Sequence, residues 1–275
     1  MKRILSCDYS MNAFRANAVF FLFILLGCAG KVETLDLIVQ TNSFNQKIYS
    51  SEFFKHLVIS NNKKETLLHI YIEGDGMPWA SRFLLSQDPT PRNPLTLKLM
   101  SLDSNRSIYV GRPCYFGLSH SKNCSSKRWT SGRYSEEVIS SMVTVIKTYL
   151  KEKKIKQFLL IGYSGGGVIA ALLADRFDKK VQYLTIASNL DIDKWADYHG
   201  YSRLIHSLNP ARKFTTKQNG IHLVGSEDVN VPRHLIDDFV NQTNNKLVVF
   251  ENYDHVCCWV DNWYSILNKY LGNIK

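Results

Sequence analysis

Residues 158–177 read FLLIGYSGGGVIAALLADRF, a stretch that predicts a strand, a sharp turn and a helix. Its first part, Phe158–Gly162, is an apolar run of strand length, which is typical of a strand buried on both faces of a parallel sheet. Its last part, Gly165–Phe177, predicts a helix. The junction GYSGG fits the pattern G-x-S-x-G in the strand–turn–helix setting that this pattern requires. The stretch therefore predicts that Ser164 stands exposed on a sharp turn at the edge of a sheet.

Small neighbours are needed around such a serine. Gly162 and Gly166 keep side chains from colliding where the backbone bends sharply. The backbone N–H of Gly165 is then expected to point where a carbonyl oxygen would become an oxyanion. A glycine-rich turn without a catalytic role is the alternative interpretation. A phosphate-binding loop is disfavoured, because the Lys-Ser/Thr pair of a P-loop is absent.

A base and an acid follow the serine in the order expected for a Ser-Asp-His triad. The predicted strand Ile221–Val224 leads into GSEDVNVP, residues 225–232, which nominates Asp228 as the acid. The predicted strand Lys246–Phe250 leads into ENYDH, which nominates His255 as the base. A serine hydroxyl needs such a base because it is a weak nucleophile at neutral pH. Three other carboxylates remain alternatives for the acid: Glu227, Asp191 and Asp193.

The loop before the serine is expected to supply a second oxyanion donor. The predicted strand Leu67–Ile72 runs into EGDG, residues 73–76. The backbone N–H of Asp75 is the first candidate, and that of Gly76 is the next. The carboxylate of Asp75 is expected to point away, because a negative charge beside an oxyanion would oppose catalysis. Arg92, Arg112 and Arg133 lie between this loop and the serine in the sequence, where they either line the site or brace loops.

Strands alternate with helices along the chain, which predicts an α/β fold with a mainly parallel sheet of about eight strands and helices on both faces. Residues 28–275 are expected to form one domain, with residues 188–218 as a small cap-like segment over the site. The further predicted strands are Thr34–Gln40, Phe53–Ser60, Ser107–Val110 and Val181–Ala187. The further predicted helices are Leu95–Leu102, Ser135–Leu150, Arg233–Val240 and Trp263–Leu271.

The first 27 residues have the features of a signal peptide. Lys2 and Arg3 precede Ala18–Leu26, an apolar run too short for a comfortable membrane span. The run ends in LLGC, which resembles a bacterial lipobox and predicts lipidation of Cys28 after cleavage. A lipid-anchored protein of the bacterial envelope is then expected, with the membrane as a partner. A cleaved but unlipidated signal, a plain anchor and a start at Met11 remain open.

The net charge and the cysteine spacing indicate whether nucleic-acid binding, zinc binding or disulfide bonds are expected. The formal charge is +10, yet no nucleic-acid motif accompanies the scattered lysines, so a basic surface is expected rather than a nucleic-acid site. No cysteine spacing is typical of a zinc site. Export favours disulfides, first Cys114 with Cys124, which fall in one loop. Pairing of that loop with Cys257 or Cys258 is the alternative.

From Thr34 onward the chain resembles the α/β-hydrolases in element order, nucleophile turn, acid turn and terminal histidine. The runs EGDGMPW, DPTPRNP, GRPC and DHVCCW together resemble a group of bacterial hydrolase-like lipoproteins. The resemblance implies a serine hydrolase that needs no metal or organic cofactor and acts on a small-molecule or lipid acyl substrate. An esterase or lipase-like enzyme is expected first. A serine peptidase and a non-catalytic envelope lipoprotein are the alternatives.

Overall fold

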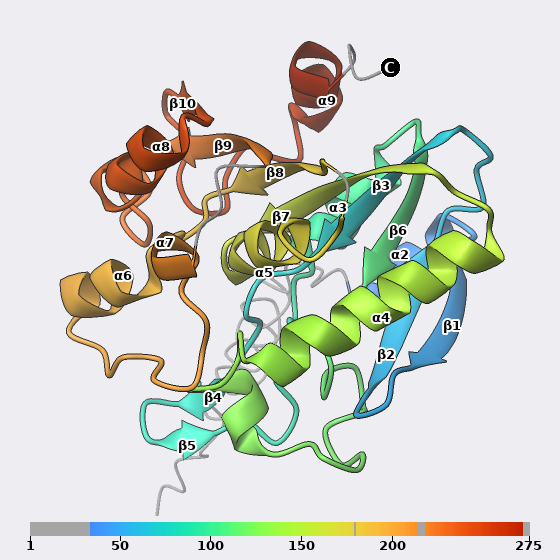
Figure 1. Ribbon diagram of the computed structural model, residues 1–275, viewed down its shortest axis with the longest axis horizontal. Coiled ribbons are helices and arrows are strands. Elements are labelled where there is room, and N and C mark those ends of the chain that lie inside the picture. The colour runs from blue at the N-terminus through green and yellow to red at the C-terminus, as the bar shows by residue number, and fades with distance from the viewer. Residues whose placement is uncertain (1–33, 179, 214–217, 272–275) are drawn as a thin grey trace, which may run out of the picture. The chain divides into compact units, whose positions relative to one another are not determined.

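The computed structural model describes residues 34–178, 180–213 and 218–271 (Figure 1). The predicted signal peptide and Cys28 lie outside these residues. Within them, no helix is long and apolar enough to cross a membrane.

An eight-stranded sheet forms the centre of the described fold, as the sequence predicts. Six neighbouring strands run parallel, and two further strands add an antiparallel edge. These strands, in their spatial order across the sheet, are β1 (Asn45–Ser50), β2 (Lys55–Ser60), β6 (Arg106–Val110), β3 (Leu67–Ile72), β7 (Gln157–Tyr163), β8 (Gln182–Ile186), β9 (Asn219–Gly225) and β10 (Lys246–Phe250).

Helices cover both faces of the sheet (Figure 1). Side chains of β7 alternate between the faces: Phe158 and Leu160 join one apolar core, and Leu159 and Ile161 join the other. The first core is completed by α4 (Glu136–Glu152), α5 (Gly165–Ala174) and α8 (Asp237–Thr243). The second is completed by α2 (Leu35–Thr41), α3 (Leu95–Ser101) and α9 (Trp263–Leu271). Burial on both faces explains why β7 is apolar throughout.

The first predicted strand is wrong, because residues 35–41 form helix α2. Leu35, Leu37 and Val39 alternate as in a strand, but Thr34 caps a helix there by accepting a hydrogen bond from the Leu37 N–H at 3.4 Å. The predicted helix Arg233–Val240 is divided into a 3₁₀ turn (Arg233–Leu235) and α8. A second short 3₁₀ turn covers Ser126–Trp129. The other predicted elements are present with small shifts of their ends.

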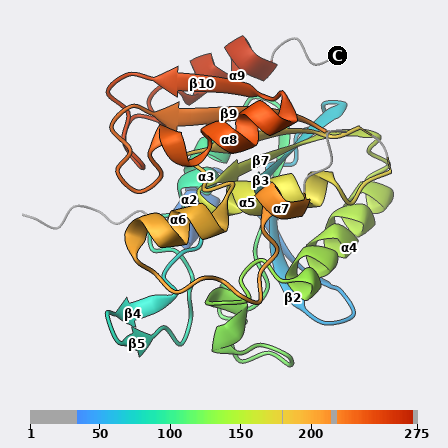
Figure 2. The same ribbon diagram turned by 60° about the vertical axis from the view of Figure 1, so that its left-hand side comes forward.

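Three features escaped the sequence prediction. Strand β1 was not expected. A two-stranded hairpin, β4 (Trp79–Ser81) and β5 (Leu84–Leu85), stands apart from the main sheet (Figure 2). The segment between β8 and β9 contains α6 (Ile192–His199) and α7 (Pro210–Lys213) where the sequence showed no regular pattern.

Candidate active site

The turn after β7 holds Ser164 in a strained backbone conformation. Its φ is 51° and its ψ is −124°, in a region that residues with a side chain rarely adopt. The turn is fixed on both sides, because the Ser164 N–H donates to the carbonyl of Ile186 at 2.8 Å and its carbonyl accepts from the Gly167 N–H at 2.9 Å. Helix α5 begins at the next residue.

The two glycines of the turn avoid steric collisions, as the sequence predicts. A Cβ on Gly162 would lie 2.2 Å from the carbonyl oxygen of Gly166. A Cβ on Gly166 would lie 2.2 Å from the carbonyl oxygen of Ile72. Neither distance is possible between non-bonded atoms, so strand, turn and helix pack this closely only because both residues lack a side chain.

The structure brings the predicted serine, histidine and aspartate into one hydrogen-bonded chain. His255 Nε2 lies 3.1 Å from Ser164 Oγ, and His255 Nδ1 lies 2.9 Å from Asp228 Oδ2. A carboxylate only accepts, so Nδ1 carries the proton and Nε2 is the acceptor that faces the serine. This is the tautomer that a general base requires.

Asp228 is held in place by the turn that contains it. Its side chain is buried, and its Oδ1 accepts hydrogen bonds from the N–H groups of Asn230 and Val231 at 2.9 and 2.8 Å. The acid turn is joined to the histidine loop, since the Glu227 N–H donates to the Tyr253 carbonyl at 2.9 Å. The acid and the base therefore keep a fixed distance.

The other candidate acids lie elsewhere. The Glu227 side chain is exposed. Asp191 caps α6, with its Oδ1 accepting from the N–H groups of Asp193 and Lys194. Asp193 pairs with Arg212 at 2.9 Å. Among the four carboxylates considered from the sequence, Asp228 is the one whose side chain contacts His255.

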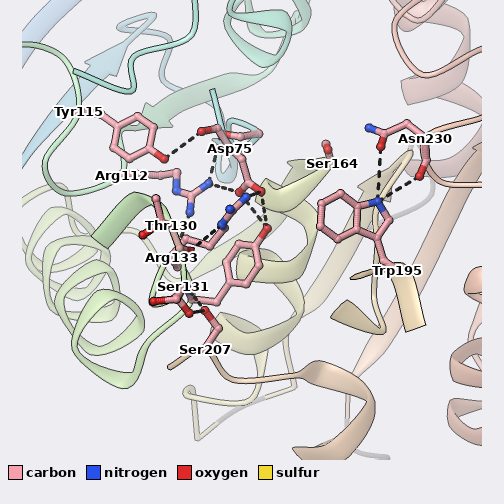
Figure 3. A network of polar contacts seen from close by, with 12 residues as sticks. Asp75, Arg112, Tyr115, Thr130, Ser131, Arg133, Ser164, Trp195, Ser207 and Asn230 are labelled. Carbon is pink, nitrogen blue, oxygen red and sulfur yellow. Dashed lines mark hydrogen bonds and ion pairs between the residues drawn. The ribbon is translucent and has the colours of Figure 1, made fainter. Parts of the chain in front are cut away.

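Asn230, which was not predicted from the sequence, also contacts the histidine. Its Nδ2 lies 3.0 Å from His255 Nε2. The orientation of the amide follows from Trp195, whose indole N–H can only donate and lies 3.1 Å from the Asn230 carbonyl and 3.4 Å from its Oδ1 (Figure 3). Asn230 thus links α6 of the cap-like segment to the base. Its place two residues after the acid was the only signal in the sequence.

The loop after β3 lies against the serine turn. A Cβ on Gly74 would be 3.4 Å from the Ser164 Cβ, so the next residue, Asp75, is beside the site. Within the described part of the chain, the backbone N–H groups of Asp75 and Gly165 donate to no other residue. The two N–H groups that the sequence nominates as oxyanion donors therefore have no acceptor among the described residues.

The carboxylate of Asp75 is directed to Arg112 and Arg133 (Figure 3). It lies against the Cα of Gly165, where a Cβ would be 2.1 Å from Asp75 Oδ1. Arg112 Nη1 and Arg133 Nη1 bind its two oxygens at 2.5 and 2.6 Å, and the Tyr134 hydroxyl donates at 2.8 Å (Figure 3). Two positive charges thus outweigh the one negative charge of Asp75.

The carboxylate of Asp75 and the guanidinium groups of Arg112 and Arg133 form a largely buried cluster in which opposite charges stabilise one another. Burial alone would raise the pKa of the Asp75 carboxyl, but Arg133 and Arg112 outweigh it and hold that pKa well below its usual range. Arg112 also donates to the Gly74 carbonyl at 3.3 Å and to the Arg133 carbonyl at 2.9 Å. The Tyr115 hydroxyl donates to the Asp75 carbonyl at 2.9 Å (Figure 3). Arg112 and Arg133 therefore brace the oxyanion loop.

Glu73 is the second buried carboxyl beside the serine. Its oxygens accept from the N–H groups of Gly74 and Thr96 and from the Thr96 hydroxyl, at 2.9–3.0 Å. Burial raises the pKa of Glu73 to about 7, although these hydrogen bonds lower it. The residue ties the oxyanion loop to the start of α3.

A cavity of about 1430 Å³ opens over Ser164 and His255. Residues of the predicted cap-like segment, from Trp195 to Leu204, line one part of it. The hairpin β4–β5 and the oxyanion loop line another part. The cavity also reaches Arg92, which is exposed at its wall, whereas Arg112 is not among its lining residues.

The structure contains the predicted disulfide between Cys114 and Cys124. Cys257 and Cys258 are joined to each other, so the alternative pairing with the loop of Cys114 does not occur. Among the residues that the structure describes, no group of three or more His, Cys, Asp or Glu side chains is arranged to hold a metal ion.

Comparison with known proteins agrees with this architecture. Residues 112–203 match the family model of the alpha/beta hydrolase fold. No curated protein matches the sequence of the chain. The chain has the α/β-hydrolase fold.

Three solved structures illustrate the likeness, which at these identities concerns the fold. An esterase from Pyrococcus furiosus is 15% identical with a TM-score of 0.63, over 85% of this chain and 93% of that one. A putative alpha/beta hydrolase from Agrobacterium tumefaciens is 13% identical with a TM-score of 0.56, over 83% and 95%. A bacterial membrane phospholipase A is 14% identical with a TM-score of 0.51, over 94% and 99%.

Proposed function

We propose that this protein is a serine hydrolase that cleaves carboxylic esters, with Ser164 as nucleophile, His255 as base and Asp228 as acid. The observation that carries the proposal is the unbroken chain of hydrogen bonds from Ser164 Oγ through His255 to Asp228, at 3.1 and 2.9 Å. The serine stands on a strained turn at the head of a helix, facing a cavity. Such an arrangement activates a hydroxyl for acyl transfer.

Each residue of the site has its own role in the reaction. Ser164 Oγ attacks the acyl carbon while His255 Nε2 takes its proton, and Asp228 stabilises the imidazolium. The backbone N–H groups of Asp75 and Gly165 hold the oxyanion, and one such donor is worth about 2.7–4 kcal/mol of barrier. The proton on His255 then goes to the leaving alcohol oxygen. Water, activated by the same imidazole, adds to the acyl carbon and releases the acid and Ser164.

The charges around the cavity favour an ester over a peptide with a free N-terminus. An ammonium group would need an unpaired carboxylate. The carboxylate of Asp75 is already ion-paired with Arg112 and Arg133. Glu73 is buried, with its pKa raised to about 7 by burial. The apolar wall suits an acyl chain, and its larger members are Met77, Trp79, Phe83, Trp195, Tyr201 and Leu204.

A fluorophosphonate probe tests the nucleophile. The wild type should be labelled and Ser164→Ala should not, with ester hydrolysis reduced about 10⁴-fold or more. Ser202→Ala is the matched control, because Ser202 also lines the cavity but is not bonded to His255. Labelling that persists in Ser164→Ala would exclude this serine as nucleophile.

The substrate class needs its own assay. We expect hydrolysis of p-nitrophenyl esters, with a preference for longer acyl chains because the cavity is large and apolar. Aminopeptidase substrates should be cleaved far more slowly. Strong amide cleavage without ester cleavage would favour the peptidase alternative.

We also propose that the chain is exported and anchored to the bacterial envelope by a lipid on Cys28. The basic start, the short apolar run and the cysteine that follows support this. So does the Cys114–Cys124 disulfide, which is typical of oxidising compartments. Radiolabelled palmitate should be incorporated by the wild type and by Cys7→Ser but not by Cys28→Ser. Unchanged labelling of Cys28→Ser would rule out the anchor.

A further inference from the structure

The β4–β5 hairpin presents apolar side chains to solvent at the cavity. Phe83 at its tip is 86% exposed, Leu84 63%, and Trp79 48%. Trp79 and Phe83 line the cavity as well. Figure 2 shows the hairpin standing away from the main sheet. Apolar side chains this exposed and this close together indicate a surface that is covered in use.

Further apolar residues belong to the same opening. Tyr201, from the cap-like segment, is 57% exposed, and Val256, next to the base, is 49% exposed. Both line the cavity that Trp79 and Phe83 line. We call Trp79, Phe83, Tyr201 and Val256, together with Leu84, the apolar rim.

The rim is also cationic. Arg82 at the hairpin tip and Arg92 both line the cavity, and neither pairs with a carboxylate in the part of the chain that the structure describes. The other two arginines of the lining are paired, Arg133 with Asp75 and Arg203 with Asp197. Two uncompensated charges therefore stand beside the exposed apolar side chains.

The combination of exposed apolar side chains and arginines indicates what covers the apolar rim. Aromatic and aliphatic side chains with arginines beside them match the boundary between acyl chains and anionic head groups in a bilayer. A protein docked on the rim would close the entrance to Ser164. A lipid surface covers the rim and leaves the cavity open to the molecules that compose it.

We propose that the apolar rim docks on an anionic phospholipid bilayer, with the tip of the β4–β5 hairpin inserted at the level of the head groups. Acyl esters then enter the cavity directly from the bilayer. This last step rests on the proposed function, whereas docking itself does not.

Local insertion must be measured, since the apolar run Ala18–Leu26 could bind a bilayer by itself. The full chain carrying Ser164→Ala, which leaves the lipids intact, is mixed with vesicles that contain shallow brominated lipid. The fluorescence of Trp79 is obtained as the difference between the emission of this protein and that of the same protein carrying Trp79→Phe. Trp129, Trp259 and Trp263 are buried, so their emission reports whether each variant is folded.

We expect bromine to quench Trp79 in vesicles that contain phosphatidylglycerol and only weakly in vesicles of phosphatidylcholine alone. Arg82→Gln should shift the insertion equilibrium about fivefold toward solvent. Phe83→Ser with Leu84→Ser should shift it about tenfold or more. Tyr264→Ser is the matched control, because Tyr264 is 61% exposed on α9, at the far end from the hairpin in both views (Figures 1 and 2), and should change nothing.

Two results would overturn the proposal. One is quenching of Trp79 that is equal in the hairpin variants and in Tyr264→Ser. The other is protection of Trp79 from iodide that grows with protein concentration in the absence of vesicles, because a second copy of the chain would then cover the rim. Neither result depends on Ser164, so failure of docking and failure of the hydrolase proposal are separable.

Discussion

Replacing Asp75 with asparagine tests how the oxyanion loop is held. The substitution keeps the backbone N–H and almost the same side-chain shape, but removes the negative charge between Arg112 and Arg133. Their side chains are only 2% and 10% exposed, so water cannot replace the lost carboxylate. Two cations would then repel each other in a buried site.

Removing one partner of a buried ion pair costs about 3–5 kcal/mol. The Asp75 side chain is 18% exposed, which places the expected loss of unfolding free energy near the lower limit, at about 3 kcal/mol. In a domain of this size that loss lowers Tm by about 6–12 °C. If the loop moves, one oxyanion donor is lost and kcat falls about 10²- to 10³-fold.

Urea denaturation and ester hydrolysis measure the two effects. Asp197→Asn is the matched control, because Asp197 forms an ion pair of similar length with Arg203 that is about half exposed, and its loss should leave the urea midpoint nearly unchanged. The pKa of Asp75 is held low in the folded state, so its contribution is present above about pH 4, the unfolded value, and is lost as pH falls. Equal stability of Asp75→Asn and wild type at pH 7 would show that the carboxylate does not stabilise the two buried arginines.

Three further predictions concern Gly165, Glu73 and the Cys114–Cys124 disulfide. Gly165→Ala should lower the free energy of unfolding by about 1–3 kcal/mol and lower the activity, because its Cβ would collide with the Asp75 carboxylate. Urea midpoints and hydrolysis rates equal to those of the wild type would show that this carboxylate moves freely. Glu73 has a pKa raised by burial from 4.5 to about 7, so between these values the unfolded chain loses the proton that the folded chain keeps. Wild-type stability relative to Glu73→Gln should therefore fall by up to about 3 kcal/mol as pH rises through this window, measured by urea titration at several pH values; a difference independent of pH would contradict it. The double variant Cys114→Ser/Cys124→Ser should lose about 3 kcal/mol, from closure of a loop of ten residues. Its Tm under reducing conditions should match that of the reduced wild type.

The strands and helices were predictable where a local pattern was strong. The run Phe158–Gly162 is apolar because β7 is buried on both faces, and its continuation into GYSGG needs glycines for contacts within the turn itself. Leu67–Ile72, Lys246–Phe250 and Trp263–Leu271 have the predicted bounds. The helix α2 was mistaken for a strand because Leu35–Val39 alternates, while the deciding hydrogen bond is the cap from Thr34.

The candidate triad was nominated by order along the chain, since the loops that follow parallel strands meet at one edge of the sheet. The sequence could not supply the partners of Asp75, because Arg112 and Arg133 lie 37 and 58 positions away in the chain. The same holds for Asn230, which is 25 positions from His255 and 35 from Trp195.

The order of strands and helices, the serine turn and the residue types at its edge follow from local sequence, because backbone preferences and apolar periodicity act over a few neighbouring positions. Long-range packing sets which charges neutralise Asp75, which amide contacts the base and which apolar side chains of the hairpin stay exposed. Those outcomes depend on the order of strands in the sheet, which brings distant loops together and sets the distances between their side chains.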